Sequence, residues 1–126
     1  MRLLLVEDDP AFAVLLAADL RGAGYIVDTA GDGEQGEFLG ATEQYDAAIL
    51  DLGLPKLASL DVLKCWRDAG NAMPVIVLTA RDAWYEIVDG FKAGADDYVC
   101  KPCHPQELLA RLQAVLKRVH HSTSPD

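Results

Sequence analysis

Five polar side chains of this sequence stand at the ends of short apolar runs, and together they suggest a reactive site. Glu7 and Asp8 follow the first run, and Asp51 follows the third. Thr79 follows the fourth run and Lys101 the fifth. In open parallel sheets, binding sites form in the crevice outside the carboxyl ends of the strands. If the runs are neighbouring strands, we expect these five side chains to meet at one edge.

The charges in this group suggest its chemistry. Three carboxylates about 5 Å apart repel one another by roughly 3 kcal/mol per pair at an effective dielectric constant of about 20, so they need a compensating cation. Oxygen ligands without histidine or thiol favour a hard ion, and we expect Mg²⁺. Lys101 would supply a point charge for an anion, and Thr79 a hydroxyl donor. This set suits phosphoryl transfer onto a carboxylate, with Asp51 on the central strand as the candidate nucleophile.

The elements that must position these residues are apolar runs alternating with stretches of helical spacing. The runs are Leu3–Val6, Tyr25–Val27, Ala47–Leu50, Pro74–Leu78 and Tyr98–Cys100. The helical stretches are Ala11–Arg21, Glu34–Ala41, Leu60–Asp68, Trp84–Ala93 and Gln106–His120. Nearly continuous apolar runs are typical of strands buried on both faces of a parallel sheet. The alternation predicts an α/β fold, a doubly wound (βα)5 unit.

Composition narrows the class of protein. A chain of 126 residues with 51% hydrophobic residues fits one domain with an aliphatic core. Acidic residues outnumber basic ones by 20 to 11, and the net charge of −9 argues against direct contact with nucleic acid phosphates. No apolar run approaches the ~20 residues of a membrane span. Three cysteines without a secretory signal predict reduced thiols in the cytoplasm.

Four segments resemble a response-regulator receiver domain: Leu3–Asp9 (LLLVEDD), Ala48–Pro55 (AILDLGLP), Val75–Arg81 (VIVLTAR) and Gly94–Pro102 (GADDYVCKP). The last segment, with the ELLAR sequence of residues 107–111, is similar to the OmpR/PhoB subfamily of transcriptional regulators. The resemblance implies a receiver domain over residues 1–119, with a five-stranded parallel sheet in the order 2-1-3-4-5. Residues 120–126 would then be a tail or the start of a linker to a C-terminal DNA-binding domain outside this chain.

The resemblance also implies roles at the site. Asp51 would accept a phosphoryl group from a phosphohistidine of a sensor histidine kinase. Glu7, Asp8 and Asp51 would hold Mg²⁺, together with the backbone carbonyl of Gly53. The chain would therefore be a phosphoacceptor signalling domain, and not a metabolic enzyme.

Further roles concern the phosphoryl oxygens and the response to them. Lys101 would pair with one oxygen and Thr79 would donate a hydrogen bond to another. Tyr98 matches the switch aromatic, which is expected to turn inward as Thr79 moves. The resemblance implies a cis Lys101–Pro102 peptide bond. The new charge would bias two pre-existing conformations, and the far face of the domain would report the shift.

That far face comprises the fourth helix, the fifth strand and the fifth helix, and in the OmpR/PhoB subfamily it forms a two-fold dimer. Its matching charged residues are Asp96, Asp97, Glu107, Arg111 and Arg118. Ile87 stands where the subfamily usually has a lysine opposite Glu107. We therefore predict a homodimer through this face, with more hydrophobic character and a weaker dependence on salt than usual.

Other positions also depart from the family pattern. Ser59 replaces a glycine that often supplies a positive φ, so we expect the loop before it to be shaped differently. Cys103 replaces a common phenylalanine. Gly53 and Ala80 are small, so we expect easy access of water to the site.

Three alternative functions follow from single features. A haloacid-dehalogenase-type phosphatase would also use a strand-end aspartate and Mg²⁺, but it needs a second carboxylate where this chain has Gly53. The segment Cys100–Cys103 matches a C-x-x-C redox motif, although it follows the last strand instead of the first. A flavin carrier would share the strand order, but the acidic residues 7–9 would repel a flavin phosphate.

Overall fold

The computed structural model describes residues 1–80 and 84–122 of the chain. Within these residues, strands and helices alternate strictly along the sequence. The strands are β1 (Arg2–Val6), β2 (Ile26–Ala30), β3 (Ala47–Asp51), β4 (Val75–Thr79) and β5 (Asp97–Cys100). The helices are α1 (Pro10–Gly22), α2 (Gly33–Thr42), α3 (Ser59–Asp68), α4 (Trp84–Ala93) and α5 (Pro105–Ser122).

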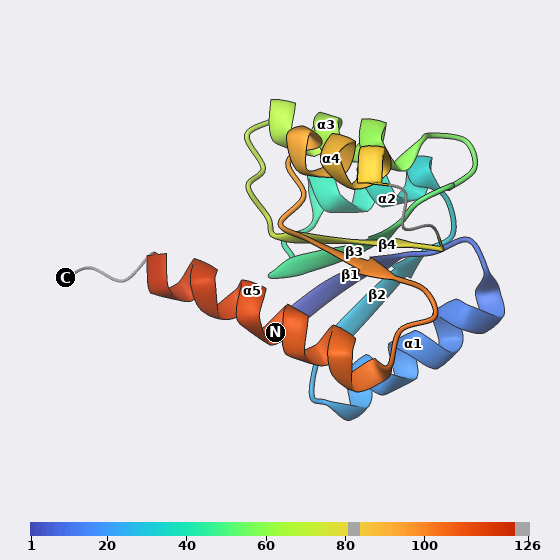
Figure 1. The fold of residues 1–126 in the computed structure, drawn as a ribbon, viewed down its shortest axis with the longest axis vertical. Coiled ribbons are helices and arrows are strands. Elements are labelled where there is room, and N and C mark those ends of the chain that lie inside the picture. The colour runs from blue at the N-terminus through green and yellow to red at the C-terminus, as the bar shows by residue number, and fades with distance from the viewer. Residues whose placement is uncertain (81–83, 123–126) are drawn as a thin grey trace.

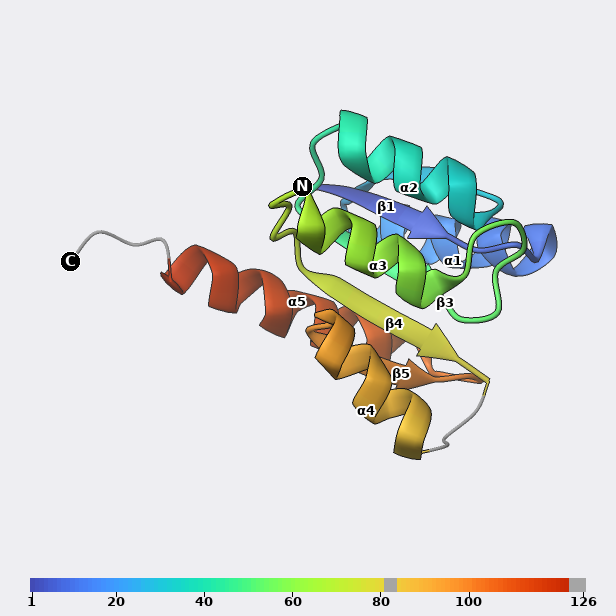
Figure 2. The same ribbon diagram turned by 90° about the horizontal axis from the view of Figure 1, so that it is seen from above.

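The strands form one parallel sheet in the order β2-β1-β3-β4-β5, which confirms the predicted fold. Helices α1 and α5 cover one face of the sheet, and α2, α3 and α4 cover the other (Figure 1). The arrowheads of β1, β4 and β5 point toward the same edge (Figure 2). This topology places the carboxyl ends of β1, β3, β4 and β5 side by side, as the candidate site requires.

The core consists of two apolar layers, one on each face of the sheet. On β1, Leu3 and Leu5 pack toward α1 and α5, whereas Leu4 and Val6 pack toward α2 and α3. All four side chains are fully buried, because helices cover both faces. The same alternation continues in β3 and β4, and this rigid sheet is what supports the site at its edge.

Helix α2 lies unusually close to its neighbours because three of its buried residues are glycines. A Cβ atom on Gly33 would lie 1.9 Å from the carbonyl oxygen of Leu57, in the loop that follows β3. A Cβ atom on Gly40 would lie 2.4 Å from the indole of Trp66 in α3. The β3–α3 loop is therefore packed directly against the first turn of α2.

The element boundaries differ from the predicted ones mainly at β2 and α5. Strand β2 ends at Ala30, three residues past the end of the predicted run. It lies at the edge of the sheet, and its polar residues Asp28 and Thr29 interrupt the apolar pattern. Helix α5 continues to Ser122, two residues past its predicted end. The remainder of the predicted tail, 123–126, and residue 81 of the third matching segment lie outside the described residues. Within the described residues, none of the helices has the length and apolarity to cross a membrane.

Candidate functional site

An acidic cluster lies at the carboxyl edge of the sheet, where the sequence predicts it. Glu7, Asp8 and Asp51 each offer an oxygen atom, and these atoms lie within 4.8 Å of one another. Glu7 and Asp51 are 2% and 5% exposed, whereas Asp8 is open to solvent. Buried carboxylates at this spacing need a positive charge to remain ionised together.

Lys101 supplies part of that charge. Its Nζ lies 2.6 Å from Oε1 of Glu7 and 2.7 Å from Oδ1 of Asp51. The lysine directly follows β5, and its peptide bond to Pro102 is cis, as the resemblance implies. Thr79 is buried at the end of β4, the strand between those of Asp51 and Lys101. The predicted convergence of the acidic residues with Lys101 is therefore confirmed, with Thr79 on the intervening strand.

The electrostatics of Asp51 follow from its burial. Burial is the main cause that raises the pKa of Asp51 to about 7; neighbouring Glu7 adds to the rise, and the Lys101 ammonium opposes it. Burial alone would lower the pKa of Lys101, but the two carboxylates outweigh it, so the pKa of the lysine is raised. Lys101 therefore stays charged. The three carboxylates of Glu7, Asp8 and Asp51 together still favour the binding of further positive charge.

Tyr98 is already directed inward. Its side chain is 9% exposed and packs under α4, where a Cβ atom on Gly90 would lie 3.1 Å from the tyrosine ring. Burial is the main cause that raises the pKa of Tyr98, and the nearby hydroxyl of Thr79 opposes this rise. This arrangement links the end of β4 at the site to the inner surface of α4.

The sequence did not indicate the roles of two further residues. Ser59, 2% exposed, donates a hydrogen bond from its hydroxyl to the main-chain carbonyl oxygen of Asp51. The loop before Ser59 has positive φ angles at Gly53 (81°) and Lys56 (72°), and its difference from the family's loop stays a prediction. Phe12 of α1 lies with its ring 4.5 Å from Nζ of Lys101. An aromatic residue one turn after the acidic pair was the only available signal for this contact.

Comparison with known proteins decides the family. The family model for the response regulator receiver domain matches residues 3–113. The chain belongs to the response regulator receiver domain family. It is 46% identical to the transcriptional regulatory protein QseB of Haemophilus influenzae over 97% of this chain and 57% of that relative. It is 41% identical to the transcriptional regulatory protein PhoP of Escherichia coli over 94% of this chain and 53% of that relative.

A solved structure with the same fold contains a metal ion. The receiver domain of the sensor histidine kinase PA1611 from Pseudomonas aeruginosa has a magnesium ion coordinated in its active site cleft. It is 33% identical to this chain, with a TM-score of 0.85 over 92% of this chain and 97% of that one. The QseB and PhoP relatives agree with the OmpR/PhoB resemblance, and this receiver spans little more than half of their length.

A cavity of about 470 Å³ lies beside the carboxyl ends of β3 and β4. It lies between the β3–α3 loop and α4, and its walls include Gly53, Ser59, Thr79, Ala80 and Glu86. A Cβ atom on Gly53 would meet no atom within 4 Å. The two small residues Gly53 and Ala80 therefore line an open cavity next to the end of β3, and easy access of water to Asp51 stays a prediction.

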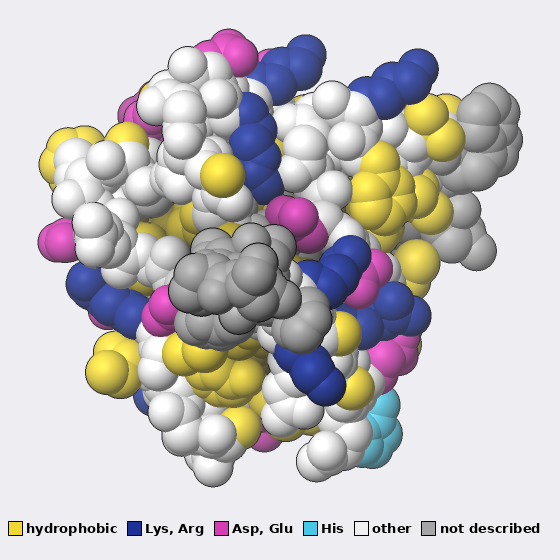
Figure 3. All heavy atoms as spheres, turned by 90° about the vertical axis from the view of Figure 1, so that its left-hand side faces the viewer, with side chains coloured by type: hydrophobic (Ala, Val, Ile, Leu, Met, Phe, Trp, Pro, Cys, Tyr) yellow, Lys and Arg dark blue, Asp and Glu magenta, His cyan; other side chains and the backbone are white. Residues whose placement is uncertain are grey.

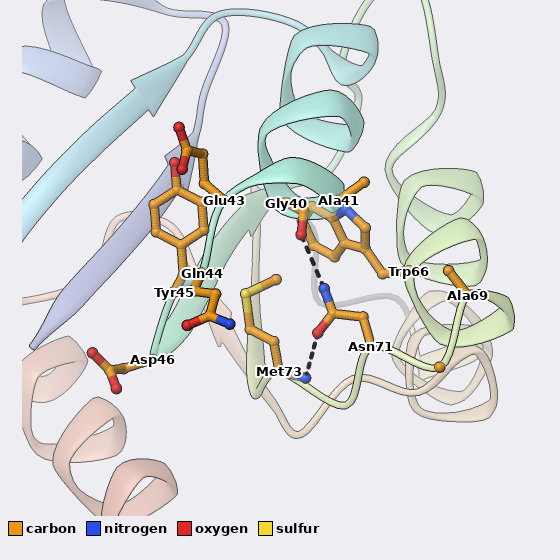
Figure 4. A pocket seen from close by; sticks show the side chains of 11 residues that line it. Gly40, Ala41, Glu43, Gln44, Tyr45, Asp46, Trp66, Ala69, Asn71 and Met73 are labelled. Carbon is orange, nitrogen blue, oxygen red and sulfur yellow. Dashed lines mark hydrogen bonds between the residues drawn. The ribbon is translucent and has the colours of Figure 1, made fainter.

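A larger cavity of about 530 Å³ lies away from the site, at the carboxyl ends of α2 and α3 (Figure 4). Asn71 crosses it, donating to the Gly40 carbonyl at 3.0 Å and accepting from the Met73 N–H at 3.0 Å. Tyr45 and Trp66 contribute aromatic walls. None of the predicted site residues lines this cavity, so we relate it to the packing of α2 on α3.

Four of the charged residues predicted for the dimer face, Asp96, Asp97, Glu107 and Arg111, have partners within one chain. Arg111 lies 3.3 Å from Asp97 and 3.3 Å from Glu107. Asp96 lies 3.2 Å from Arg67 of α3 and accepts a hydrogen bond from the Val75 N–H. These contacts hold the charged side chains of the face in defined positions in the single chain.

The apolar part of that face comes from α4. Ile87 is half-buried and packs in part against the core, whereas Tyr85, Val88 and Phe91 are large hydrophobic side chains that α4 exposes. Arg118 is exposed on α5. Figure 3, which views the end of the molecule from which α5 projects, shows hydrophobic side chains interspersed with basic and acidic ones.

Cys103 of the C-x-x-C motif lies in an environment that disfavours a reactive thiol. Cys100 is exposed and Cys103 is half-buried, and no disulfide joins any of the three cysteines, all of which lie in the described residues. Burial is the main cause that raises the pKa of Cys103, and Glu107 adds to the rise. A redox-active thiol has a lowered pKa, so this environment disfavours the alternative.

Proposed function

We propose that this receiver domain accepts a phosphoryl group on Asp51 from a phosphohistidine of a sensor histidine kinase. The observation that carries the proposal is the position of the Asp51 carboxylate. It lies 2.7 Å from the Lys101 ammonium and within 4.8 Å of the oxygens of Glu7 and Asp8. A buried carboxylate between a cation and an acidic pair suits attack on phosphorus.

The acidic cluster has the donor set of a magnesium site. Glu7, Asp8 and Asp51 would hold Mg²⁺, with the backbone carbonyl of Gly53 as a further ligand. All of these donors are oxygen atoms, which a hard divalent ion prefers, and open solvent at Asp8 leaves room for bound waters. A bound Mg²⁺ neutralises charge on the transferring phosphoryl group. The magnesium ion in the PA1611 receiver domain supports this choice.

Phosphoryl transfer to Asp51 forms one bond to phosphorus and breaks another. A carboxylate oxygen of Asp51 forms a bond to phosphorus, and the bond from phosphorus to the donor imidazole nitrogen breaks. The electron pair of the broken bond stays on that nitrogen. Lys101 pairs with one phosphoryl oxygen, and Thr79 donates its hydroxyl to another. Hydrolysis by water later returns Asp51 and releases inorganic phosphate.

The output would be control of transcription. Thr79 would move toward the phosphoryl group, and this movement would stabilise the inward position of Tyr98 under α4. The position of Tyr98 on β5, paired with β4 and packed under α4, supports this coupling. Since QseB and PhoP are transcriptional regulatory proteins, we infer that the domain acts in the cytoplasm through a C-terminal DNA-binding domain.

The phosphorylated receiver would form a two-fold homodimer through α4, β5 and α5. The charged residues would set the register of the dimer more than its affinity, because exposed ion pairs contribute only about 0–1 kcal/mol each. The exposed Val88 and Phe91 of α4, with Ile87 in place of a lysine, would add apolar contact area. Sedimentation at several protein and salt concentrations tests this. A phosphorylated chain that stays monomeric at every concentration would contradict the dimer.

Intact mass measurement tests the phosphoacceptor role. The chain is incubated with phosphoramidate and Mg²⁺, and we expect a gain of one phosphoryl group. Asp51→Asn should gain none, while Asp68→Asn, an exposed control at the end of α3, should gain as much as the wild type. Labelling that persists in Asp51→Asn would place the acceptor elsewhere.

A further inference from the structure

We infer that Phe12 is a positioning residue for phosphoryl transfer: the face of its ring holds the Lys101 ammonium in place beside Asp51. The inference rests on the proposed function, since it assigns Lys101 to the phosphoryl group. Its basis is the distance of 4.5 Å between Nζ of Lys101 and the centre of the Phe12 ring. Cations within about 6 Å of an aromatic face are attracted by the negative charge of that face.

The first turn of α1 fixes the position of the ring. Asp9 caps this helix and accepts hydrogen bonds from the N–H groups of Ala11, at 3.1 Å, and Phe12, at 3.3 Å. Pro10 stands at the first helical position, where its fixed φ suits the helix. Phe12 is half-buried and packs against the core layer formed with α1 and α5. The ring therefore has little freedom to leave the lysine.

The ring differs in kind from the other two partners of Lys101. Glu7 and Asp51 hold the ammonium at 2.6 and 2.7 Å, but both are also proposed metal ligands, and Asp51 is the acceptor. Their contacts with Lys101 must change when the site is in use. Phe12 is uncharged and binds neither metal nor phosphoryl group, so its contact can persist. It orients the ammonium without competing for the anion that Lys101 must bind.

Fluorination of one ring separates this role from packing. Phenylalanine analogues with one, two and three ring fluorines are incorporated at position 12, which weakens the negative face and changes the size little. Phosphorylation by phosphoramidate is measured at saturating Mg²⁺. We expect the rate to fall with each fluorine, by about tenfold for the trifluoro ring, the fold-change that such a contact supports. The same series at Phe38, which is 61% exposed on α2, should leave the rate unchanged.

A second readout does not depend on activity. NMR spectra of the metal-free chain are recorded with ¹³C-labelled lysine. The ring current of Phe12 should change the chemical shifts of the Lys101 side-chain protons that lie beside the ring. Phe12→Leu should remove this shift and slow phosphorylation about tenfold. Equal rates across the fluorinated series, or Lys101 protons at ordinary positions in the wild type, would overturn the inference. Failure of the wild type to gain any phosphoryl group would instead overturn the proposed function, while the ring-current shift would still report the contact.

Discussion

Replacing Ser59 by glycine, the residue usual in the family, is expected to destabilise this receiver. Family-typical residues commonly stabilise a protein. Here, however, the Ser59 hydroxyl is buried and donates to the main-chain carbonyl of Asp51. The substitution removes that donor from the last residue of β3. The expected loss of stability is opposite in sign to the usual effect of a family-typical residue, so this substitution is a sensitive test of the structure.

The expected magnitude follows from the hydrogen bond and the backbone. A buried carbonyl left without its donor costs about 1–3 kcal/mol. Glycine in place of serine in the first turn of α3 adds roughly 0.5 kcal/mol through lost helix propensity. We therefore expect Ser59→Gly to lower the free energy of unfolding by about 2 kcal/mol. Ser59→Ala, which keeps the propensity, should lower it by about 1–2 kcal/mol.

Urea denaturation followed by far-ultraviolet circular dichroism measures both variants. The matched control is Thr42→Ala, because the Thr42 hydroxyl donates to the Phe38 carbonyl at 2.8 Å on the exposed surface of α2. Water replaces that bond, so the control should change the free energy of unfolding by less than about 0.5 kcal/mol. If Ser59→Ala is as stable as Thr42→Ala, the buried hydrogen bond has no energetic role and the reasoning is wrong.

Two further predictions concern packing and pH. Gly40→Ala should destabilise the domain by about 1–3 kcal/mol, because the new Cβ atom would lie 2.4 Å from the Trp66 indole. Gly22→Ala is the control and should not destabilise the domain, because no atom lies within 4 Å of its Cβ position. Urea denaturation of both variants measures the difference. Without metal, the pKa of Asp51 rises from 3.8 unfolded to about 7 folded, so its contribution to stability is full below about pH 4 and lost as pH rises through 7. Asp51→Asn should therefore be more stable than the wild type at pH 8 in chelator, with the difference vanishing near pH 4; thermal unfolding that shows no such pH dependence would contradict the buried environment of Asp51.

Much of the site could be predicted because a parallel sheet imposes it. Buried strands are nearly continuous apolar runs, so the residue after each run marks the carboxyl edge of the sheet. Glu7, Asp8, Asp51 and Lys101 met there as predicted. Strand β2 was the least accurately predicted strand, because an edge strand includes polar residues such as Asp28 that interrupt the pattern.

The remaining contacts depend on side-chain directions that no periodicity encodes. The ring of Phe12 reaches Lys101 from a helix almost ninety residues earlier in the sequence, and only the folded topology brings them together. Asp96 was predicted for the dimer face alone, yet Arg67 of α3 pairs with it inside the chain. The serine at position 59 appeared as a departure from a family glycine, and its hydrogen bond to the acceptor residue required coordinates.

The most direct test of this account is a crystal structure of the domain with Mg²⁺ and beryllofluoride, a stand-in for the phosphoryl group. The account predicts the ion bonded to Glu7, Asp8 and Asp51, with the beryllium on the Asp51 carboxylate and the Lys101 ammonium on a fluorine atom. An ion bound away from these carboxylates, or a beryllofluoride group attached to another residue, would contradict it.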